Sequence, residues 1–152
     1  MSHPKIPDTQ ALYETMSLGV VFHDEKLRIV AANQAAGEIL GIESEELIGR
    51  APCDQNWKAT RRDGSPFRGD EHPVSVALTT GQPVGRTLMG VYNPRVGESR
   101  WLAVRASPLF HEGEPEPYGA FSTFADVTEM ERMEESEERH RTLFQKNLAL
   151  ML

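Results

Sequence analysis

The segment GAFSTFADVTE, residues 119–129, joins a strand pattern to a helix pattern. Its first part alternates with the period of two that is typical of a β-strand. Asp126 then precedes Glu129 by three positions, which is the spacing of a capping box at the start of a helix. A helical pattern continues from there to about residue 147. The segment therefore predicts a strand that passes directly into a C-terminal helix.

Two more strands are predicted immediately before this segment. PVGRTLMGVY, residues 83–92, and RWLAVRASPLF, residues 100–110, have the same alternation and are separated by connections of hairpin length that are rich in Gly and Pro. Trp101 is expected on the outer face of the sheet. If Arg105 faces water, the alternation puts three apolar residues on the core face: Leu102, Val104 and Ala106.

The first part of the chain predicts a further hairpin and a helix. GVVFH and LRIVAA, residues 19–23 and 27–32, are strand-like segments on either side of a polar turn. Asn33 follows at the position of a helix N-cap, and Gly41 marks the end of that helix. Since two strands precede the helices and three follow them, one antiparallel sheet can form only if this hairpin lies beside the last strand.

The middle of the chain predicts short helices and a loop. A helical segment is expected over 44–49, and no periodicity is found over 50–68, where Pro and Asp-Gly indicate turns. Pro73 favours the first position of another helix, which puts His72 near its N-cap and Gly81 after its end. The predicted fold class is α+β, with a five-stranded antiparallel sheet, short helices over one face, and a covered pocket between them.

Composition excludes several classes of protein. The net charge of −7 argues against binding to duplex nucleic acid. No apolar run approaches the roughly 20 residues needed to span a bilayer, and the first residues lack the apolar region of a secretory signal, so we expect a cytoplasmic domain without membrane contact. One cysteine allows no internal disulfide, and we expect no metal site. No motif of a nucleophilic, zinc or nucleotide-dependent enzyme is found, so we expect no catalysis.

Six motifs in this order resemble the PAS family of sensory domains. They are GVVFHDEKLRIVAAN, LIGR, RRDGSPF, ALTTGQPV, RWLAVRASPL and FADVTE, and they extend from residue 18 to about residue 131. Asp126-Val127-Thr128 resembles the DIT motif that joins the last strand to the signalling helix in that family. The resemblance implies a PAS-like fold and a relay of signal through Asp126, Thr128 and Glu129.

The resemblance also implies a division of the chain. We expect a lead-in over 1–17, the PAS domain over 18–126, a signalling helix over 127–147, and over 148–152 the start of a following domain that is cut short. In this family the effector is often a histidine kinase and sometimes a diguanylate cyclase. No motif of either effector is found in these residues.

A pocket under the helices is the candidate binding site. The resemblance to light-sensing relatives implies that Phe124 faces inward, and strand alternation then turns Ser122 and Ala120 the same way. Such a lining suits a small apolar organic or lipid-like ligand. The alternative is a fully packed core that uses the same side chains. The residues predicted to form the pocket are Val76, Leu102, Val104, Ala120, Ser122, Phe124 and Trp57.

No cofactor is predicted. Cys53 lacks the basic and aromatic neighbours of the cysteine in flavin-binding relatives, so we interpret it as a structural thiol. Haem-binding relatives use a histidine within the helix, whereas His72 precedes Pro73 and is expected to have a capping or surface position. His23 is on the first strand, and its direction is not fixed by the sequence.

The C-terminal helix is predicted to form a homodimer. Opposite charges at the i,i+4 spacing support an exposed helix, and the apolar seam is thin, as in a coiled coil of limited stability. Our leading interpretation is a sensory or dimerisation module that transmits a change to this helix. The second is an interaction domain without a ligand. The seam consists of Met130, Met133, His140 and Phe144.

Overall fold

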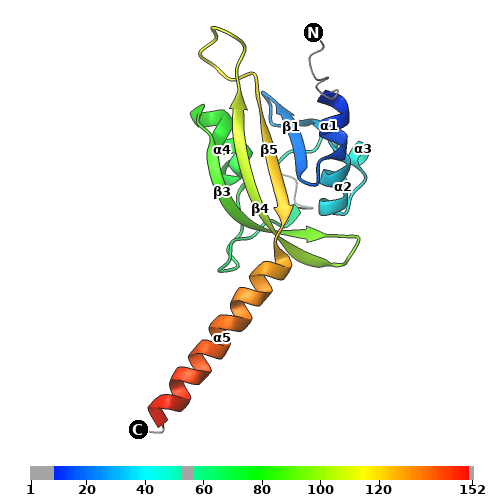
Figure 1. The fold of residues 1–152 in the computed structure, drawn as a ribbon. Coiled ribbons are helices and arrows are strands. Elements are labelled where there is room, and N and C mark those ends of the chain that lie inside the picture. The colour runs from blue at the N-terminus through cyan, green and yellow to red at the C-terminus, as the bar shows by residue number, and fades with distance from the viewer. Residues whose placement is uncertain (1–8, 53–56, 151–152) are drawn as a thin grey trace, which may run out of the picture.

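The structure, a computed structural model, describes residues 9–52 and 57–150 (Figure 1). Five antiparallel strands form one sheet in the order β2-β1-β5-β4-β3. The predicted sheet is confirmed, including the position of the first hairpin beside the last strand. The strands are β1 (Gly19–Asp24), β2 (Ile29–Ala32), β3 (Val84–Asn93), β4 (Glu98–Leu109) and β5 (Gly119–Asp126).

Short helices connect the two hairpin-like halves of the sheet. Helix α4 contacts β3, β4 and β5, and α2 contacts β1, β3 and β5, so both pack against the sheet. The helices before β3 are α1 (Thr9–Thr15), α2 (Gln34–Leu40), α3 (Ser44–Leu47), the 3₁₀-helix η2 (Gly69–Glu71) and α4 (Pro73–Thr80). Gly41 and Gly81 end α2 and α4 in the left-handed conformation, as their positions in the sequence predict.

The segment predicted as a loop over 50–68 is partly paired with the sheet. Thr60 forms a bridge with Pro66 and a second one with Gly90 on β3, where the two backbone N–H···O bonds are both 2.8 Å long. The prediction of a loop for this segment was therefore incomplete. A single bridge has no period, so the alternation of side chains could not indicate it.

Two glycines permit the close pairing of β1 with β5. Gly19 lies opposite Phe124, and a Cβ at Gly19 would overlap the Phe124 ring. At the other end of the ladder, a Cβ at Gly119 would overlap the backbone oxygen of His23. A side chain at Gly19 would displace the Phe124 ring from the core, and one at Gly119 would displace the backbone of β1.

Asn33 fixes the first hairpin to α1 and α2. Its Oδ1 accepts from the backbone N–H groups of Ala36 and Val20, at 3.0 and 2.9 Å, and its Nδ2 donates to the carbonyls of Tyr13 and Leu18, both at 2.9 Å. The residue is completely buried. The predicted N-cap is confirmed, and the same side chain also holds the start of β1.

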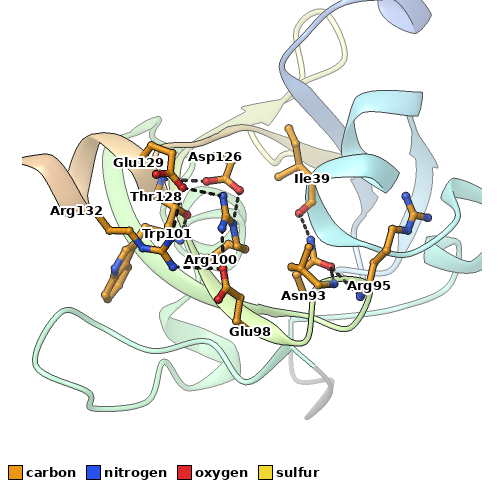
Figure 2. Close-up of polar contacts among 11 residues, drawn as sticks. Ile39, Asn93, Arg95, Glu98, Arg100, Trp101, Asp126, Thr128, Glu129 and Arg132 are labelled. Atoms are coloured by element: carbon orange, nitrogen blue, oxygen red, sulfur yellow. Dashed lines mark hydrogen bonds and ion pairs between the residues drawn. The ribbon is translucent and has the colours of Figure 1, made fainter.

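Asn93 makes a similar connection at the β3–β4 turn (Figure 2). Its Nδ2 donates to the Ile39 carbonyl of α2 at 3.1 Å, and its Oδ1 accepts from the N–H of Arg95 at 2.9 Å. The end of α2 is thus attached to the hairpin that closes the other side of the sheet.

The core lies between the inner face of the sheet and the helices. On β4, Leu102, Val104 and Ala106 are buried, whereas Arg105 is exposed, as the alternation predicts. Trp101 lies opposite Gly90 in the ladder, on the outer face, where it was expected. The main cluster contains Val21, Ile29, Ala36, Leu40, Leu47, Trp57, Ala59, Met89, Val91, Leu102, Val104 and Phe124.

Helix α5 (Thr128–Leu150) extends away from the sheet as a single rod (Figure 1). It continues three residues beyond the predicted end at residue 147, so residues 148–150 are helical. Its apolar side chains are exposed along most of the rod: Met130, Met133, Leu143, Phe144 and Leu148. Only the start of the helix is in contact with the sheet, at β4.

We expect Asn33→Ala to lower the free energy of unfolding by about 2–3 kcal/mol, because buried backbone groups lose their hydrogen-bond partners. Urea denaturation measures this change. Gln34→Ala is the matched control, since Gln34 is exposed and its side chain bonds the exposed Glu38. A loss below about 0.5 kcal/mol for Asn33→Ala, the range of ordinary surface substitutions, would contradict the structural assignment of this side chain.

Candidate functional site: an internal cavity and the start of α5

A partly open cavity of about 90 Å³ lies between the inner face of the sheet, the start of α4 and the segment around Trp57. Its wall is almost entirely apolar, and the only polar side-chain groups among the described lining residues are two imidazoles, one hydroxyl and the Trp57 indole N–H. That N–H already donates to the carbonyl of Ala51 at 2.9 Å. The lining residues are Val21, His23, Ile29, Leu40, Ala51, Pro52, Trp57, His72, Pro73, Val74, Met89, Val91, Leu102, Val104, Ser122 and Phe124.

Five of the seven predicted pocket residues line this cavity, and they come from three separate segments. Two are on β4, two are on β5, and one precedes the bridge at Thr60. The structure thus brings together Leu102, Val104, Ser122, Phe124 and Trp57.

Val76 and Ala120 lie outside the cavity. Val74 is one of the four buried residues of α4 and contributes to the lining, whereas Val76 is partly exposed and does not. Ala120 packs with Val74, Ala77 and Ala106 in a second core cluster. Small alanine side chains let α4 lie close to β4 and β5 here, and this contact fills the end of the interior where the sequence predicted open space.

Two histidines in the lining were not predicted as pocket residues. His23 is 7% exposed, and its Nδ1 is buried with no hydrogen-bond partner within the described part of the chain. His72 has the backbone angles of an N-cap, but its ring makes no capping bond and lies edge-on to Phe67 at 6.0 Å. Strand alternation groups His23 with Val21, which is a signal that could have placed it in the core.

Burial keeps both histidines neutral. Desolvation lowers the pKa of His23 from 6.5 to about 4, and the nearby His72 lowers it further, whereas Asp24 acts in the opposite direction. Desolvation also lowers the pKa of His72 to about 4, and Glu71 opposes the shift. At neutral pH the cavity therefore contains imidazole rather than imidazolium.

Within residues 9–52 and 57–150, no three His, Cys, Asp or Glu side chains could together hold a metal ion. None of the helices in these ranges has the length and hydropathy of a transmembrane span. Cys53, interpreted above as a structural thiol, lies outside the described residues.

The start of α5 is attached to β4 by a set of short contacts (Figure 2). The Asp126 carboxylate accepts from Arg100 Nε at 2.9 Å and from the backbone N–H of Thr128 at 2.9 Å. The Thr128 hydroxyl accepts from the backbone N–H of Trp101 at 2.8 Å, and the N–H of Val127 donates to the Trp101 carbonyl at 2.8 Å. The chain thus turns from β5 into α5 while it remains bonded to β4.

Charge supports this junction. Burial acts to raise the pKa of Asp126, but the hydrogen bonds from Thr128 and Arg100 outweigh it and hold the pKa below its ordinary value. The pKa of Arg100 is raised by its bonds to Asp126 and Glu98. The ionised pair is therefore the favoured state of the junction at neutral pH.

The predicted capping box between Asp126 and Glu129 is not found among the described residues, because Asp126 accepts from the N–H of Thr128 instead of that of Glu129. The Glu129 carboxylate lies 3.8 Å from Arg100 and 3.4 Å from Arg132, which also contacts Glu98 at 3.2 Å. The arginine of β4 competes for the Glu129 carboxylate, and no sequence pattern indicates this competition because the residues are far apart in the chain.

A second contact with α5 was missed by the sequence analysis. Glu131 is 5% exposed, and its Oε2 accepts from Arg62 Nη2 at 2.7 Å. Arg62 belongs to the segment that begins beside the cavity at Trp57 and is bridged to β3 through Thr60. The segment that covers the cavity is therefore connected to the first turns of α5.

The family model for the PAS fold matches residues 13–132. This chain belongs to the PAS family. The match includes the whole sheet of the PAS domain, the cavity and the start of α5. A comparison with curated proteins gave no significant match.

Solved PAS structures share this fold at low sequence identity. The PAS domain of nitrogen regulation protein NR(II) from Vibrio parahaemolyticus is 16% identical, with a TM-score of 0.60 over 80% of this chain and 100% of that one. A sensory box histidine kinase/response regulator from Burkholderia thailandensis is 21% identical, with a TM-score of 0.60 over 90% and 97%.

A third similar structure contains a small molecule. It is the PAS domain of a LuxR-family transcriptional regulator from Burkholderia thailandensis in complex with ethanol. It is 18% identical, with a TM-score of 0.55 over 80% of this chain and 98% of that one. These likenesses establish the fold of the domain.

The neutral histidines predict a pH dependence of stability. The unfolded chain takes up protons below pH 6.5, whereas folded His23 does so only near pH 4, so the free energy of unfolding should fall between these values as pH is lowered. The contribution of His23 is about 3 kcal/mol, and the partly exposed His72 adds less in the same window.

Urea denaturation at several pH values between 7 and 4 measures this fall. In His23→Leu the contribution of His23 should disappear, and the stability curve should be flatter over that window. His140→Gln, on the exposed part of α5, should keep the slope of the parent. An unchanged slope in His23→Leu would show that His23 is not held neutral by burial.

Proposed function

We propose that this PAS domain is the sensory input of a larger signalling protein, in which a small molecule in the cavity changes the attachment of α5. One observation carries the proposal: the cavity wall and the junction share adjacent residues on two strands. Leu102 lines the cavity, and its neighbour Trp101 donates to Thr128. Phe124 also lines the cavity and is two residues before Asp126.

The relay follows from this proximity. A ligand that moves the side chains of Leu102 or Phe124 also moves the strand ends that hold Asp126 and Thr128. The bond from Arg62 to Glu131 gives a second connection, from the segment covering the cavity. A ligand can shift the equilibrium between two attachments of α5 only by the difference in its affinity for the two states. Because the junction is held by a few polar bonds, a difference of a few kcal/mol is enough to change its attachment.

The output is proposed to be a histidine kinase, with a diguanylate cyclase as the alternative effector. Two of the similar PAS domains come from a nitrogen regulation protein and from a sensory box histidine kinase. We propose residues 18–126 as the sensor, 127–147 as the signalling helix in a cytoplasmic homodimer, and 148–152 as the start of a following domain. The exposed Met130, Met133 and Phe144 would form the dimer seam.

A ligand-free interaction domain is the second candidate. Apolar packing fills most of the interior, and the alanine cluster under α4 leaves no space at that end. In this alternative the cavity is a packing defect, and the domain acts only by holding two copies of α5 together.

Native mass spectrometry of the purified 152-residue chain, together with its absorption spectrum, separates the two candidates. A small molecule bound at one per chain and absent after denaturation is the result that we expect. Ser122→Phe, which places a large side chain in the cavity, should remove that mass. A parent protein that carries no ligand, with the same dimerisation in parent and Ser122→Phe, would favour the interaction domain.

The junction makes a separate prediction. Asp126→Ala should loosen the start of α5, because Arg100 and the Thr128 N–H lose their acceptor, while the cavity keeps all its lining residues. Amide hydrogen exchange should accelerate in residues 128–132, and the free energy of unfolding should fall by about 1 kcal/mol, as when a helix cap is lost.

Glu129→Ala is the control for the junction, since its side chain is 74% exposed and its contacts with arginine are longer. It should change exchange in α5 much less than Asp126→Ala does. Equal exchange in parent and Asp126→Ala would exclude Asp126 as the attachment point of the helix.

A further inference from the structure

The polar groups of the cavity are gathered at one place on the inner face of the sheet. Ser122 on β5 pairs with Val21 of β1, and Ala120 pairs with His23, so Ser122 and His23 are diagonal neighbours on adjacent strands. His72, at the start of α4, also lines the cavity and is close enough to His23 to affect its pKa. The rest of the described wall is apolar apart from the bonded Trp57 N–H.

Two of these polar groups form no hydrogen bond with the described residues. Nδ1 of His23 is buried and has no hydrogen bond within the described residues, and the Ser122 hydroxyl, in a residue 7% exposed, forms none with them either. Buried polar groups in folded proteins almost always have a partner, and an ordered water or a small polar ligand in the cavity would supply one here. His23 and Ser122 are both more than nine-tenths buried.

The charge of the wall decides which molecules fit. No Lys, Arg, Asp or Glu is found among the described lining residues, so a charged ligand would have no partner of opposite charge. Binding an anion would require protonation of a histidine whose pKa is lowered to about 4. Charges buried without a partner are strongly disfavoured, so the described part of the wall disfavours both carboxylates and amines at neutral pH.

The volume sets the size of the ligand. A cavity of about 90 Å³ has room for more than one water molecule. It is well below the roughly 300–1,000 Å³ typical of pockets for drug-sized ligands. The part of a ligand that lies inside the cavity therefore has only a few non-hydrogen atoms.

We propose that the cavity binds a short, uncharged alcohol whose hydroxyl group hydrogen-bonds His23 and Ser122 and whose alkyl part lies against the apolar wall. A hydroxyl both donates and accepts, so it can pair with imidazole in either neutral tautomer and with the serine hydroxyl at the same time. The alkyl part would lie toward Met89, Val91 and Leu102, on β3 and β4. This inference rests on the proposed sensory function and specifies its ligand.

The test compares three probes of four carbon atoms at pH 7: 1-butanol, its isomer diethyl ether, and butyrate. Binding to the 152-residue chain is measured by NMR titration, with ¹⁵N-labelled histidine to observe the His23 ring. We expect 1-butanol to bind at least tenfold more tightly than butyrate and more tightly than the ether, and to shift the ring nitrogen signals of His23.

Two variants assign the contact. His23→Leu should weaken 1-butanol binding about tenfold and remove the preference over diethyl ether, and His23→Gln, which keeps hydrogen-bonding groups, should restore part of it. Thermal unfolding of each variant shows whether it is folded. His111→Gln, in the exposed β4–β5 turn, is the matched control and should bind as the parent does.

Each outcome has a distinct meaning. Equal or tighter binding of butyrate would overturn the selection for uncharged ligands. Unchanged 1-butanol binding in His23→Leu would overturn the contact with His23. Either result would still leave a cavity that binds ligands, so the proposed sensory function would stand. If no probe binds and the native chain carries no small molecule, the cavity holds water only, and the alcohol and the proposed sensory function both fall.

Discussion

The antiparallel ladder between β1 and β5 joins the two halves of the domain, and the rest of the structure depends on it. Without this pairing, β1–β2 and β3–β4–β5 would be separate pieces, and neither could enclose an interior. Glycine at each end of the ladder, Gly19 and Gly119, lets the strands approach where any Cβ would overlap Phe124 or the His23 backbone. Closure of the sheet at this point also places His23 beside Ser122, so the pairing creates the polar part of the cavity.

The same ladder connects the cavity to the exit of the chain. Phe124 pairs with Gly19 and Val104, and two residues later Asp126 pairs with Leu102. Strands transmit a displacement along their length because each backbone group is bonded to its neighbour. Helix α5 is instead held at its start by side-chain contacts with Glu98, Arg100 and Trp101 of β4 and by the bond from Arg62 to Glu131. A rigid sheet with a weakly attached helix is an arrangement in which a small change inside the domain can alter the direction or pairing of the helix.

Much of the fold could be predicted from the sequence because it rests on local patterns. The alternation in β3, β4 and β5, the cap at Asn33, and the turn from Asp126 into α5 each depend on neighbouring residues. The candidate site was only partly predictable. Strand alternation predicts the cavity residues on β4 and β5, which are Leu102, Val104, Ser122 and Phe124. Helix α4 has four buried positions among eight residues, so its pattern did not indicate that Val74 rather than Val76 faces the cavity.

The sequence by itself determined the five strands, their order, the antiparallel closure, and the ends of helices at Asn33, Gly41 and Gly81. Tertiary structure alone decided which way His23 faces, that His72 approaches it, that Ala120 is packed under α4, and that Arg62 reaches Glu131 across 69 residues of sequence. The reason is physical. Periodicity reports which side chains share a face, since it is set by backbone geometry within one element. It does not report which face of another element they meet, because that depends on how segments far apart in the chain pack together.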